Sequence, residues 1–282
     1  MSAGAPLGEA IRAATAKGGP ALVAYLTAGF PRRESFREHV RALASAADVI
    51  EIGVPFTDPM ADGVTIQRAS QTALAQGASL RWILAELQSL EGVRAPRLLM
   101  SYLNPLLAFG LGRLAEGAAR AGVAGFIVPD LPLEESAELR SALEPRGIAL
   151  VQMVTPLTGP ERLRALCAAS RGFVYAVTMT GTTGRNVAVP DEVLGYLDRV
   201  RASSPIPVCA GFGIRSRAQV ERLTGHVDGV VVGSALVEAL ERELTPQPLL
   251  QLVTARLPKR QRAEVVPEPR MPGSAASRSS AY

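Results

Sequence analysis

Residues 48–63 read DVIEIGVPFTDPMADG, and this stretch places a charged side chain inside a segment of strand type. The run 48–53 is apolar and β-branched around Glu51. Because strand side chains alternate between two faces, Glu51 shares a face with Val49 and Gly53. A buried carboxylate without a partner is costly or takes up a proton. The position therefore predicts either an acid held by backbone amides or an acid that faces a cleft.

A second carboxylate follows eleven residues later. Asp62 stands in a loop punctuated by proline and glycine. Two neighbouring carboxylates with perturbed pKa values are typical of acid–base catalysis. We favour a catalytic pair over a purely structural buried acid.

Short apolar runs of strand type recur along the chain on both sides of this segment. They lie at 21–27, 48–53, 97–102, 124–128, 149–153, 173–177, 207–210 and 229–233. Segments of helical period, such as 35–47 and 134–143, separate them. Such alternation predicts parallel strands buried on both faces, and eight of them close into a (β/α)8 TIM barrel; a doubly wound sheet is the alternative. The long gap after the second strand leaves room for an extra loop and helix.

Composition limits the remaining possibilities. The 282 residues are 48% hydrophobic and 20% charged, enough to bury one large core. Neither a signal peptide nor an apolar run of the ~20 residues that a membrane helix needs is apparent. Two cysteines are too few for a disulfide framework, and a cytoplasmic location is expected.

The net charge of +4 is concentrated at the end of the chain. Residues 259–282 hold five basic and two acidic side chains, so they carry +3 and the rest of the chain +1. This segment is rich in Pro, Ser and Arg, and we expect a disordered tail after a barrel domain of residues 1–258. Because the barrel domain is nearly neutral, we do not expect it to bind nucleic acid.

Glycine-rich clusters at late strand ends predict an anion site. They read TGTTG at 180–184, AGFGIRS at 210–216 and VGSA at 232–235. Successive backbone N–H groups at a loop-to-helix start bind phosphate, and the last strands of such barrels are its usual place.

Other mechanisms lack the residues that they need. The two lysines, Lys17 and Lys259, fall outside the strand ends, which argues against a Schiff base. The two histidines show no metal-ligand spacing; we expect His39 on a helix surface and His226 in a turn. Acid–base work is left to carboxylates.

Six motifs together resemble the tryptophan synthase alpha chain family. In order they read EIGVPFTDPMADG, LLMSYLNP, FIVPDLPLEE, GFVYAVTMTGTTG, AGFGIRS and GVVVGSALV. The resemblance covers about residues 20–240, and the segment around Glu51 and Asp62 is its most specific part. Thr57 stands where the family usually has serine, and Thr182 where it usually has valine.

The resemblance implies a lyase of tryptophan biosynthesis. It would cleave indole-3-glycerol phosphate by a retro-aldol reaction into indole and glyceraldehyde 3-phosphate, without a metal or cofactor of its own. It implies that Glu51 protonates the ring carbon and then accepts the proton of the adjacent hydroxyl. Asp62 would bind the indole N–H, and Tyr175 would lie beside the substrate.

The resemblance also implies a set of binding residues. Thr183 would position Asp62, and Asp130 would support loop closure or cap a helix. The phosphate-binding positions would be Gly184, Gly213, Gly233 and Ser234. The apolar walls around the indole would be Tyr25, Leu99, Ile127, Met153 and Phe212.

The family implies a partner as well, a β chain that carries pyridoxal phosphate within an α2β2 tetramer. The contact surface would include Pro55, Phe56, Asp58, Asn104 and Pro105. Three alternatives stay open: a stand-alone lyase, a sugar-phosphate isomerase or epimerase on the same barrel, and a regulatory subunit without activity.

Overall fold

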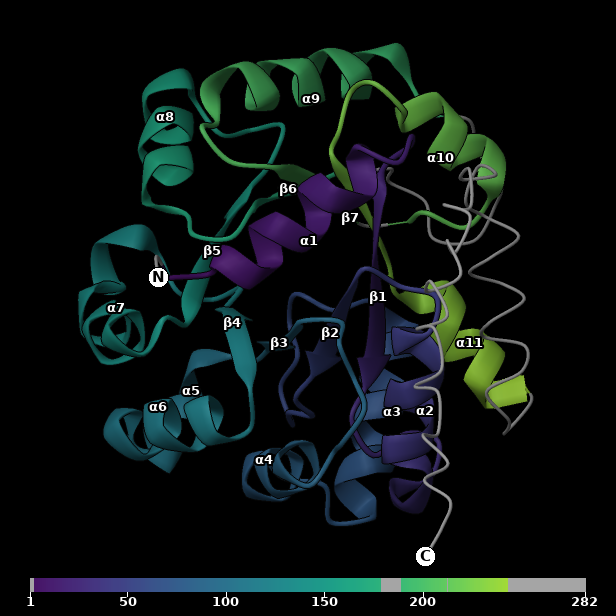
Figure 1. Cartoon of the computed structure of the whole chain (residues 1–282), viewed down its shortest axis with the longest axis vertical. Helices are drawn as coiled ribbons and strands as arrows, with labels where there is room; N and C mark the ends of the chain where they lie inside the picture. The colour runs from purple at the N-terminus through teal and green to yellow at the C-terminus, as the bar shows by residue number, and fades with distance from the viewer. Residues whose placement is uncertain (1–2, 179–188, 212, 243–282) are drawn as a thin grey trace, which may run out of the picture.

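A computed structural model describes residues 3–178, 189–211 and 213–242, and its centre is a closed barrel of eight parallel strands (Figure 1). The strands pair in chain order, and β8 returns to β1, which excludes the doubly wound alternative. They are β1 (Ala21–Thr27), β2 (Val49–Gly53), β3 (Arg97–Met100), β4 (Val123–Ile127), β5 (Ala149–Val154), β6 (Val174–Val177), β7 (Val208–Gly211) and β8 (Gly229–Val232). Each begins and ends within two residues of its predicted bounds.

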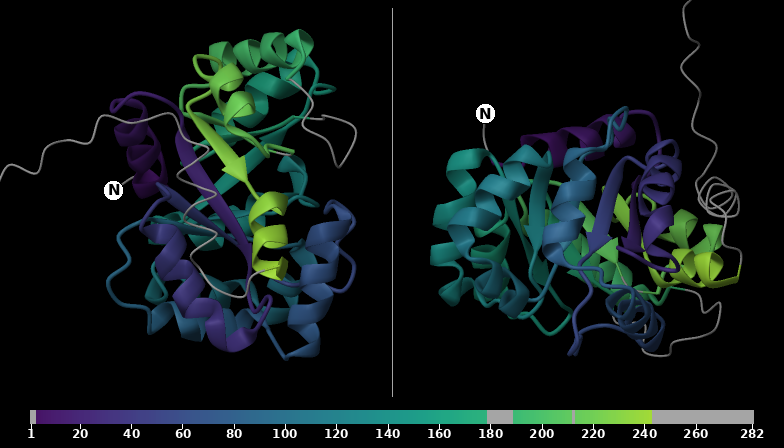
Figure 2. Two further views of the ribbon diagram at one scale, coloured as in Figure 1. Left: turned by 90° about the vertical axis from the view of Figure 1, so that its right-hand side faces the viewer. Right: turned by 90° about the horizontal axis from the view of Figure 1, so that it is seen from below.

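Helices follow the strands and surround the barrel (Figure 2). They are α1 (Ala5–Thr15), α2 (Phe36–Ala44), α3 (Val64–Ala75), α4 (Leu80–Gln88), α5 (Leu103–Phe109), α6 (Leu111–Arg120), α7 (Ala137–Leu143), α8 (Pro160–Ala169), α9 (Asp191–Ser203), α10 (Arg217–Leu223) and α11 (Ser234–Arg242). Short 3-10 turns, η1 (Arg33–Ser35), η2 (Leu133–Glu135) and η3 (Glu144–Arg146), adjoin α2 and α7. The extra helix predicted between the second and third strands is confirmed by α3 and α4, which occupy that connection in succession.

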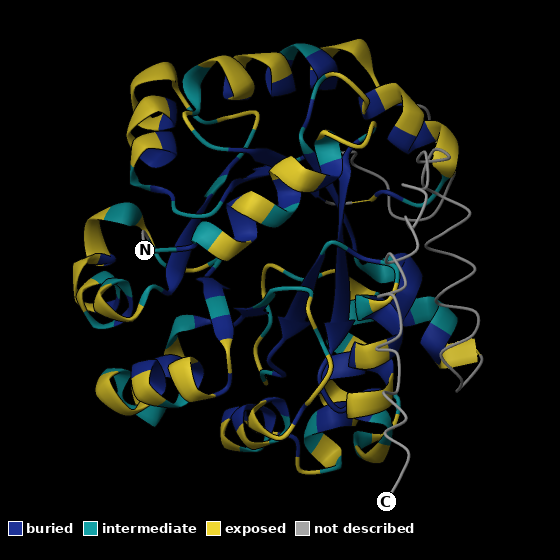
Figure 3. Ribbon diagram, viewed as in Figure 1, coloured by how far each residue is buried: buried dark blue, intermediate teal, exposed yellow. Residues whose placement is uncertain are grey.

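Strand register separates the interior of the barrel from its outer face. Tyr25 pairs with Glu51, and Glu51 with Leu98, so these side chains share one face. The alternate residues, such as Ile50 and Ile52, are fully buried beneath the surrounding helices. Figure 3 shows the result: strands that are largely buried, and helices exposed on their outer sides.

The helix α1 lies against β1, β2 and β4 at the end of the barrel where the strands begin. Its Leu7 reaches so far inward that a Cβ added to Gly125 would lie 2.8 Å from Leu7 Cδ1. The Gly4 N–H also donates to Gly147 O at 3.0 Å. Helix α1 therefore packs against this end of the barrel, and the loops that carry Asp62 and the glycine clusters lie at the opposite end, where the strands finish.

Three expectations from the sequence have different outcomes. The expected surface position of His39 is wrong: it is fully buried, because α2 turns Phe36, His39, Val40 and Leu43 toward the strands. His226 does lie in a turn and contacts Asp198. The expected tail 259–282 lies outside the described residues.

None of the helices that the structure describes is long and apolar enough to cross a membrane.

Candidate active site

Glu51 projects into the barrel from the middle of β2 and is only 1% exposed. Its Oε2 atom is buried and has no hydrogen-bond partner among the described residues. Burial raises the pKa of Glu51 to about 8, and the nearby charge of Asp62 raises it further in the same direction. The acid therefore rests in its protonated form near neutral pH, with a carboxyl oxygen available to a ligand.

Asp62 enters the same space from the loop after β2. The Tyr102 hydroxyl donates a hydrogen bond to its Oδ2 at 3.3 Å and accepts one from the Ala61 N–H at 2.8 Å. Burial raises the pKa of Asp62 to about 6, while the Tyr102 bond acts in the opposite direction. Asp62 is therefore ionised at neutral pH, where Glu51 is not.

The sequence analysis gave no role to Tyr102, the last residue of the expected strand 97–102. The structure makes it the contact that orients Asp62, and its own ring is held by Phe56, with ring centroids 5.2 Å apart. No local pattern links residues 62 and 102. The signal was only a buried tyrosine at a strand end, which needs a partner for its hydroxyl.

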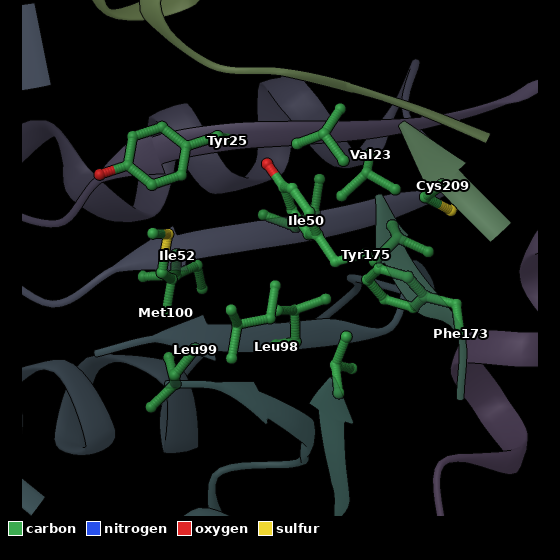
Figure 4. Packing of buried hydrophobic residues seen from close by; sticks show 14 of the residues in the cluster. Val23, Tyr25, Ile50, Ile52, Leu98, Leu99, Met100, Phe173, Tyr175 and Cys209 are labelled. Carbon is green, nitrogen blue, oxygen red and sulfur yellow. The ribbon is translucent and has the colours of Figure 1, made fainter. Parts of the chain in front are cut away.

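Two tyrosines reach into the barrel above glycines of neighbouring strands. A Cβ on Gly53 would lie 2.1 Å from the Tyr25 hydroxyl oxygen, and a Cβ on Gly211 the same distance from that of Tyr175. The Tyr25 hydroxyl lies 3.1 Å from Thr27 Oγ1. Figure 4 shows both rings among the apolar side chains of the core. Glycine at these two positions is what admits the phenols.

The remaining apolar walls fit in part. Ile127 pairs with Met100 and Val151, and Met153 with Tyr175, so both share the face of Glu51 and Tyr25. The expectation for Leu99 is wrong by one residue. It pairs with Ile52 and Phe126, and these side chains face the surrounding helices. Met100 occupies the interior position instead.

The predicted phosphate positions lie on two adjacent loops where they are described. Gly213 follows β7 with a φ of 81°, which favours glycine. Gly233 precedes α11, whose first residue is Ser234, so that the free N–H groups of this first turn face the end of the barrel. Thr182, Thr183, Gly184 and Phe212 lie outside the described residues, and their roles stay predictions.

Because the strands are paired in the order β8, β1, β2, the predicted phosphate position, Tyr25 and Glu51 follow one another around the barrel. The Gly233 position lies 3.6 Å from Tyr25 Cβ, measured from an added Cβ, and Tyr25 in turn pairs with Glu51. An anion at α11 and an acid on β2 are thus separated by a single strand that carries an aromatic ring. A phosphorylated ligand with an aromatic or aliphatic body fits this arrangement.

The segments that follow the strands around this opening, two loops and helix α5, expose large apolar side chains. Met60, Leu107 and Leu157 are 90%, 48% and 84% exposed and follow β2, β3 and β5. Of the predicted interface residues, Asp58 and Asn104 are exposed, and Phe56 and Pro105 partly so. Pro55 is buried and anchors its loop, so it does not offer surface to a partner.

Asp130 accepts hydrogen bonds from the Leu103 N–H at 2.9 and 3.2 Å, and it thereby caps the first turn of α5. The expectation that Asp130 is itself an N-cap residue is wrong, because the N-caps of η2, α7 and α5 are Pro132, Ser136 and Tyr102. The expected part in loop closure stays a prediction.

Taken together, the fold and the site define a (β/α)8-barrel enzyme that pairs a protonated and an ionised carboxyl group. Within the part of the chain that the structure describes, no cluster of His, Cys, Asp or Glu could hold a metal ion.

Comparison with known proteins gives the family. The family model of the tryptophan synthase alpha chain matches residues 11–262, and the chain belongs to this family. A tryptophan synthase alpha chain of Nitratidesulfovibrio vulgaris is 48% identical over 233 residues, which cover 82% of this chain and 91% of the relative. One from Bacillus thuringiensis is 44% identical over 237 residues, 83% of this chain and 92% of the relative.

Solved structures agree. A tryptophan synthase structure from M. tuberculosis superimposes with a TM-score of 0.81 at 38% identity, covering 89% of this chain and 96% of the other. A chain of the tryptophan synthase a2b2 complex from Pyrococcus furiosus gives a TM-score of 0.79 at 35% identity, covering 84% and 97%.

Proposed function

We propose that this chain is the α subunit of a tryptophan synthase, and that Glu51 and Asp62 carry its reaction. The reaction is the cleavage of indole-3-glycerol phosphate to indole and glyceraldehyde 3-phosphate. The observation that supports these roles is the difference between the pKa values of two neighbouring carboxyl groups. The pKa of Glu51 is about 8 and that of Asp62 about 6, so one begins as an acid and the other as an anion.

Glu51 serves twice in one turnover. Its protonated carboxyl donates a proton to the ring carbon that bears the glycerol phosphate chain. The resulting carboxylate then accepts the proton of the hydroxyl on the adjacent carbon. The carbon–carbon bond breaks as that hydroxyl becomes the aldehyde, and the bonding electrons return to the ring to give indole. Glu51 ends protonated, and no net proton is consumed.

Asp62 stabilises the charge that this sequence creates. Protonation of the ring carbon leaves a positive charge at the indole nitrogen, and an ionised carboxylate beside the N–H lowers the energy of that state. The Tyr102 hydroxyl supports this role twice, because it fixes Asp62 Oδ2 in place and favours its ionised form.

The binding surfaces suit this substrate more than a small sugar phosphate. The glycines after β7 and β8 would hold the phosphate, and Tyr25, Ile127, Met153 and Tyr175 form an apolar enclosure for a bicyclic ring. An isomerase or epimerase of sugar phosphates uses carboxylates but has no need for such walls.

The chain itself uses no cofactor, and its partner is the β chain that holds pyridoxal phosphate. The rim with exposed Met60, Leu107 and Leu157 supports an interface at the end of the barrel from which indole would leave. Phe56 and Asp58 lie on the same loop as Met60, and Asn104 and Pro105 lie on α5 with Leu107. An α2β2 assembly follows by similarity to the Pyrococcus furiosus complex. Two buried free thiols, Cys167 and Cys209, are in keeping with a cytoplasmic location.

The test is to incubate the purified chain with indole-3-glycerol phosphate, with and without a β chain, and to measure indole and glyceraldehyde 3-phosphate. Asp62→Asn should lose at least ~100-fold in turnover yet retain affinity for a substrate analogue. Asp198→Asn, a change at an exposed aspartate far along the chain, is the control and should be unaffected.

Each result has a definite reading. Release of both products by the chain alone supports a lyase that works without its partner, and release only with a β chain supports obligatory coupling. No cleavage under either condition would contradict the proposed function. An Asp62→Asn variant that turns over normally but binds the analogue poorly would make Asp62 a binding residue only.

A further inference from the structure

A cavity lies at the opposite end of the barrel from the two carboxyl groups. Its volume is about 630 Å³, within the roughly 300–1,000 Å³ of small-molecule sites. It is bounded by α1 and by the residues that precede or open β3, β4 and β5. No residue of the candidate active site lines it.

The charged groups of this cavity are unbalanced. Three arginines line it, Arg94, Arg97 and Arg146, against one acid, Glu9. Glu9 forms no salt bridge with any of them. Arg146 has one long ion pair with Glu116, at 3.6 Å and outside the lining. The cavity therefore carries a positive charge that its own walls do not neutralise.

Arg97 is the central group, because much of its guanidinium is buried. Its Nε and Nη1 atoms are buried and have no hydrogen-bond partner among the described residues. Within the ranges that the structure describes, its only side-chain hydrogen bond is a long one, from Nη2 to Gly122 O at 3.5 Å. A guanidinium remains charged in proteins, so donors left in this way are costly unless an acceptor reaches them. Burial accordingly lowers the pKa of Arg97.

The backbone is shaped around this side chain. Gly122 has a φ of 65°, and a Cβ there would lie 2.6 Å from Arg97 Nη2. Any other residue would press on the guanidinium and strain the turn into β4. The position of Arg97 is thus maintained by a specific turn, although no acceptor in the described part of the chain compensates its buried donors.

We propose that this cavity is a binding site for a small anion, with a phosphate or carboxylate group that accepts hydrogen bonds from Arg97 and neutralises Arg94 and Arg146. An oxyanion matches arginine in charge and in donor geometry. The site is separate from the phosphate position at α11, since the two lie at opposite ends of the strands. Its ligand stabilises the folded chain without competing for the substrate.

Inorganic phosphate is the probe, and thermal melting at constant ionic strength is the measurement. Because the α11 position would also bind phosphate, the experiment uses a Ser234→Asp background, in which a carboxylate repels anions from that end. In this background the melting temperature should rise with phosphate concentration. With Arg97→Met added, roughly 10- to 100-fold more phosphate should be needed for the same rise in melting temperature. This factor corresponds to the loss of a hydrogen bond to a charged group.

A matched control removes the same charge from the same end of the barrel. Arg120 closes α6, directly before β4, is exposed and does not line the cavity. Arg120→Met in the Ser234→Asp background should therefore keep the full phosphate response. In phosphate-free buffer, Arg97→Met should melt no lower than its parent, because it removes a buried charge without a partner.

Two results would overturn the proposal. One is a phosphate response that survives Arg97→Met, or that Arg120→Met reduces equally, since either would reduce the effect to general surface charge. The other is a Ser234→Asp chain that does not respond to phosphate at all. Neither result depends on the proposed cleavage reaction, which is measured separately by product release.

Discussion

Replacing Glu51 by glutamine removes the catalytic acid, yet it should stabilise the folded protein relative to wild type. This gain in the free energy of unfolding should increase as the pH rises. The carboxyl group is buried at 1% exposure, and its folded-state pKa is about 8 against an ordinary 4.5. That difference corresponds to roughly 5 kcal/mol of unfolding free energy lost when the group must be ionised in the folded state. About 3 kcal/mol of it is lost by pH 7, since the unfolded chain is ionised there and the folded chain is not.

The direction with pH is fixed by the raised pKa. Below pH 4.5 both states hold the proton, and the full stability is present. It decreases as the pH rises from 4.5 through about 8, and changes no further above that value. Glutamine does not titrate, so the stability of Glu51→Gln relative to wild type should increase across this window and then level off.

Urea unfolding of both proteins at half-unit steps from pH 4.5 to 9 measures this difference, and effects common to both chains cancel. Glu38→Gln, at an exposed position on α2, is the control and should show a flat difference within about 0.5 kcal/mol. A flat profile for Glu51→Gln would refute the reasoning, because it would mean that the acid is already ionised or solvated in the folded chain.

Three further predictions follow from the same geometry. The kcat/KM for indole-3-glycerol phosphate should peak between pH 6 and 8, since it needs an ionised Asp62 and a protonated Glu51. Tyr102→Phe should raise the lower pH limit of this activity range, because the lost hydrogen bond favours the ionised form of Asp62. A kcat/KM that falls on neither the acid nor the alkaline side would contradict the assignment. Gly211→Ala should destabilise the chain by ~1–3 kcal/mol, because its Cβ would lie 2.1 Å from the Tyr175 hydroxyl, whereas Gly112→Ala, with open space around it, should be tolerated; equal melting temperatures for the two would be inconsistent with the close approach. Deleting residues 259–282 should leave melting and turnover unchanged, because the few apolar residues of this segment cannot offset ~1–2 kcal/mol of backbone ordering per residue; a clear drop in either quantity would mean that the segment docks.

The barrel and its reactive acid are visible in the sequence for a common reason. Parallel strands buried on both faces must be almost entirely apolar, so eight short apolar runs stand out, and so does a carboxylate in the middle of one of them. Glu51 was recognisable because nothing in the packing of a barrel calls for a charge at that position.

The same physics hides the direction of side chains. Leu98, Leu99 and Met100 are all apolar because both faces of β3 are buried, so their sequence does not tell which of them points inward. The register also shifts between Arg97 and Leu98 against β4.

Contacts between distant segments are the other part that the sequence did not supply. The hydrogen bond from Tyr102 to Asp62 joins residues 40 positions apart and depends on how two loops meet. His39 is a different case. Its spacing from Phe36, Val40 and Leu43 already placed it on the buried face of α2, and its polarity alone suggested the surface.

The central claim is that one buried carboxyl group donates and then accepts the proton in carbon–carbon cleavage. The most direct test is the rate of indole release from indole-3-glycerol phosphate by Glu51→Gln, beside wild type and Glu38→Gln, with a β chain present. The amide can neither donate nor accept the proton, so turnover should fall by ~10,000-fold or more while the analogue still binds. Turnover within tenfold of wild type would show that Glu51 is not the acid and base of this reaction.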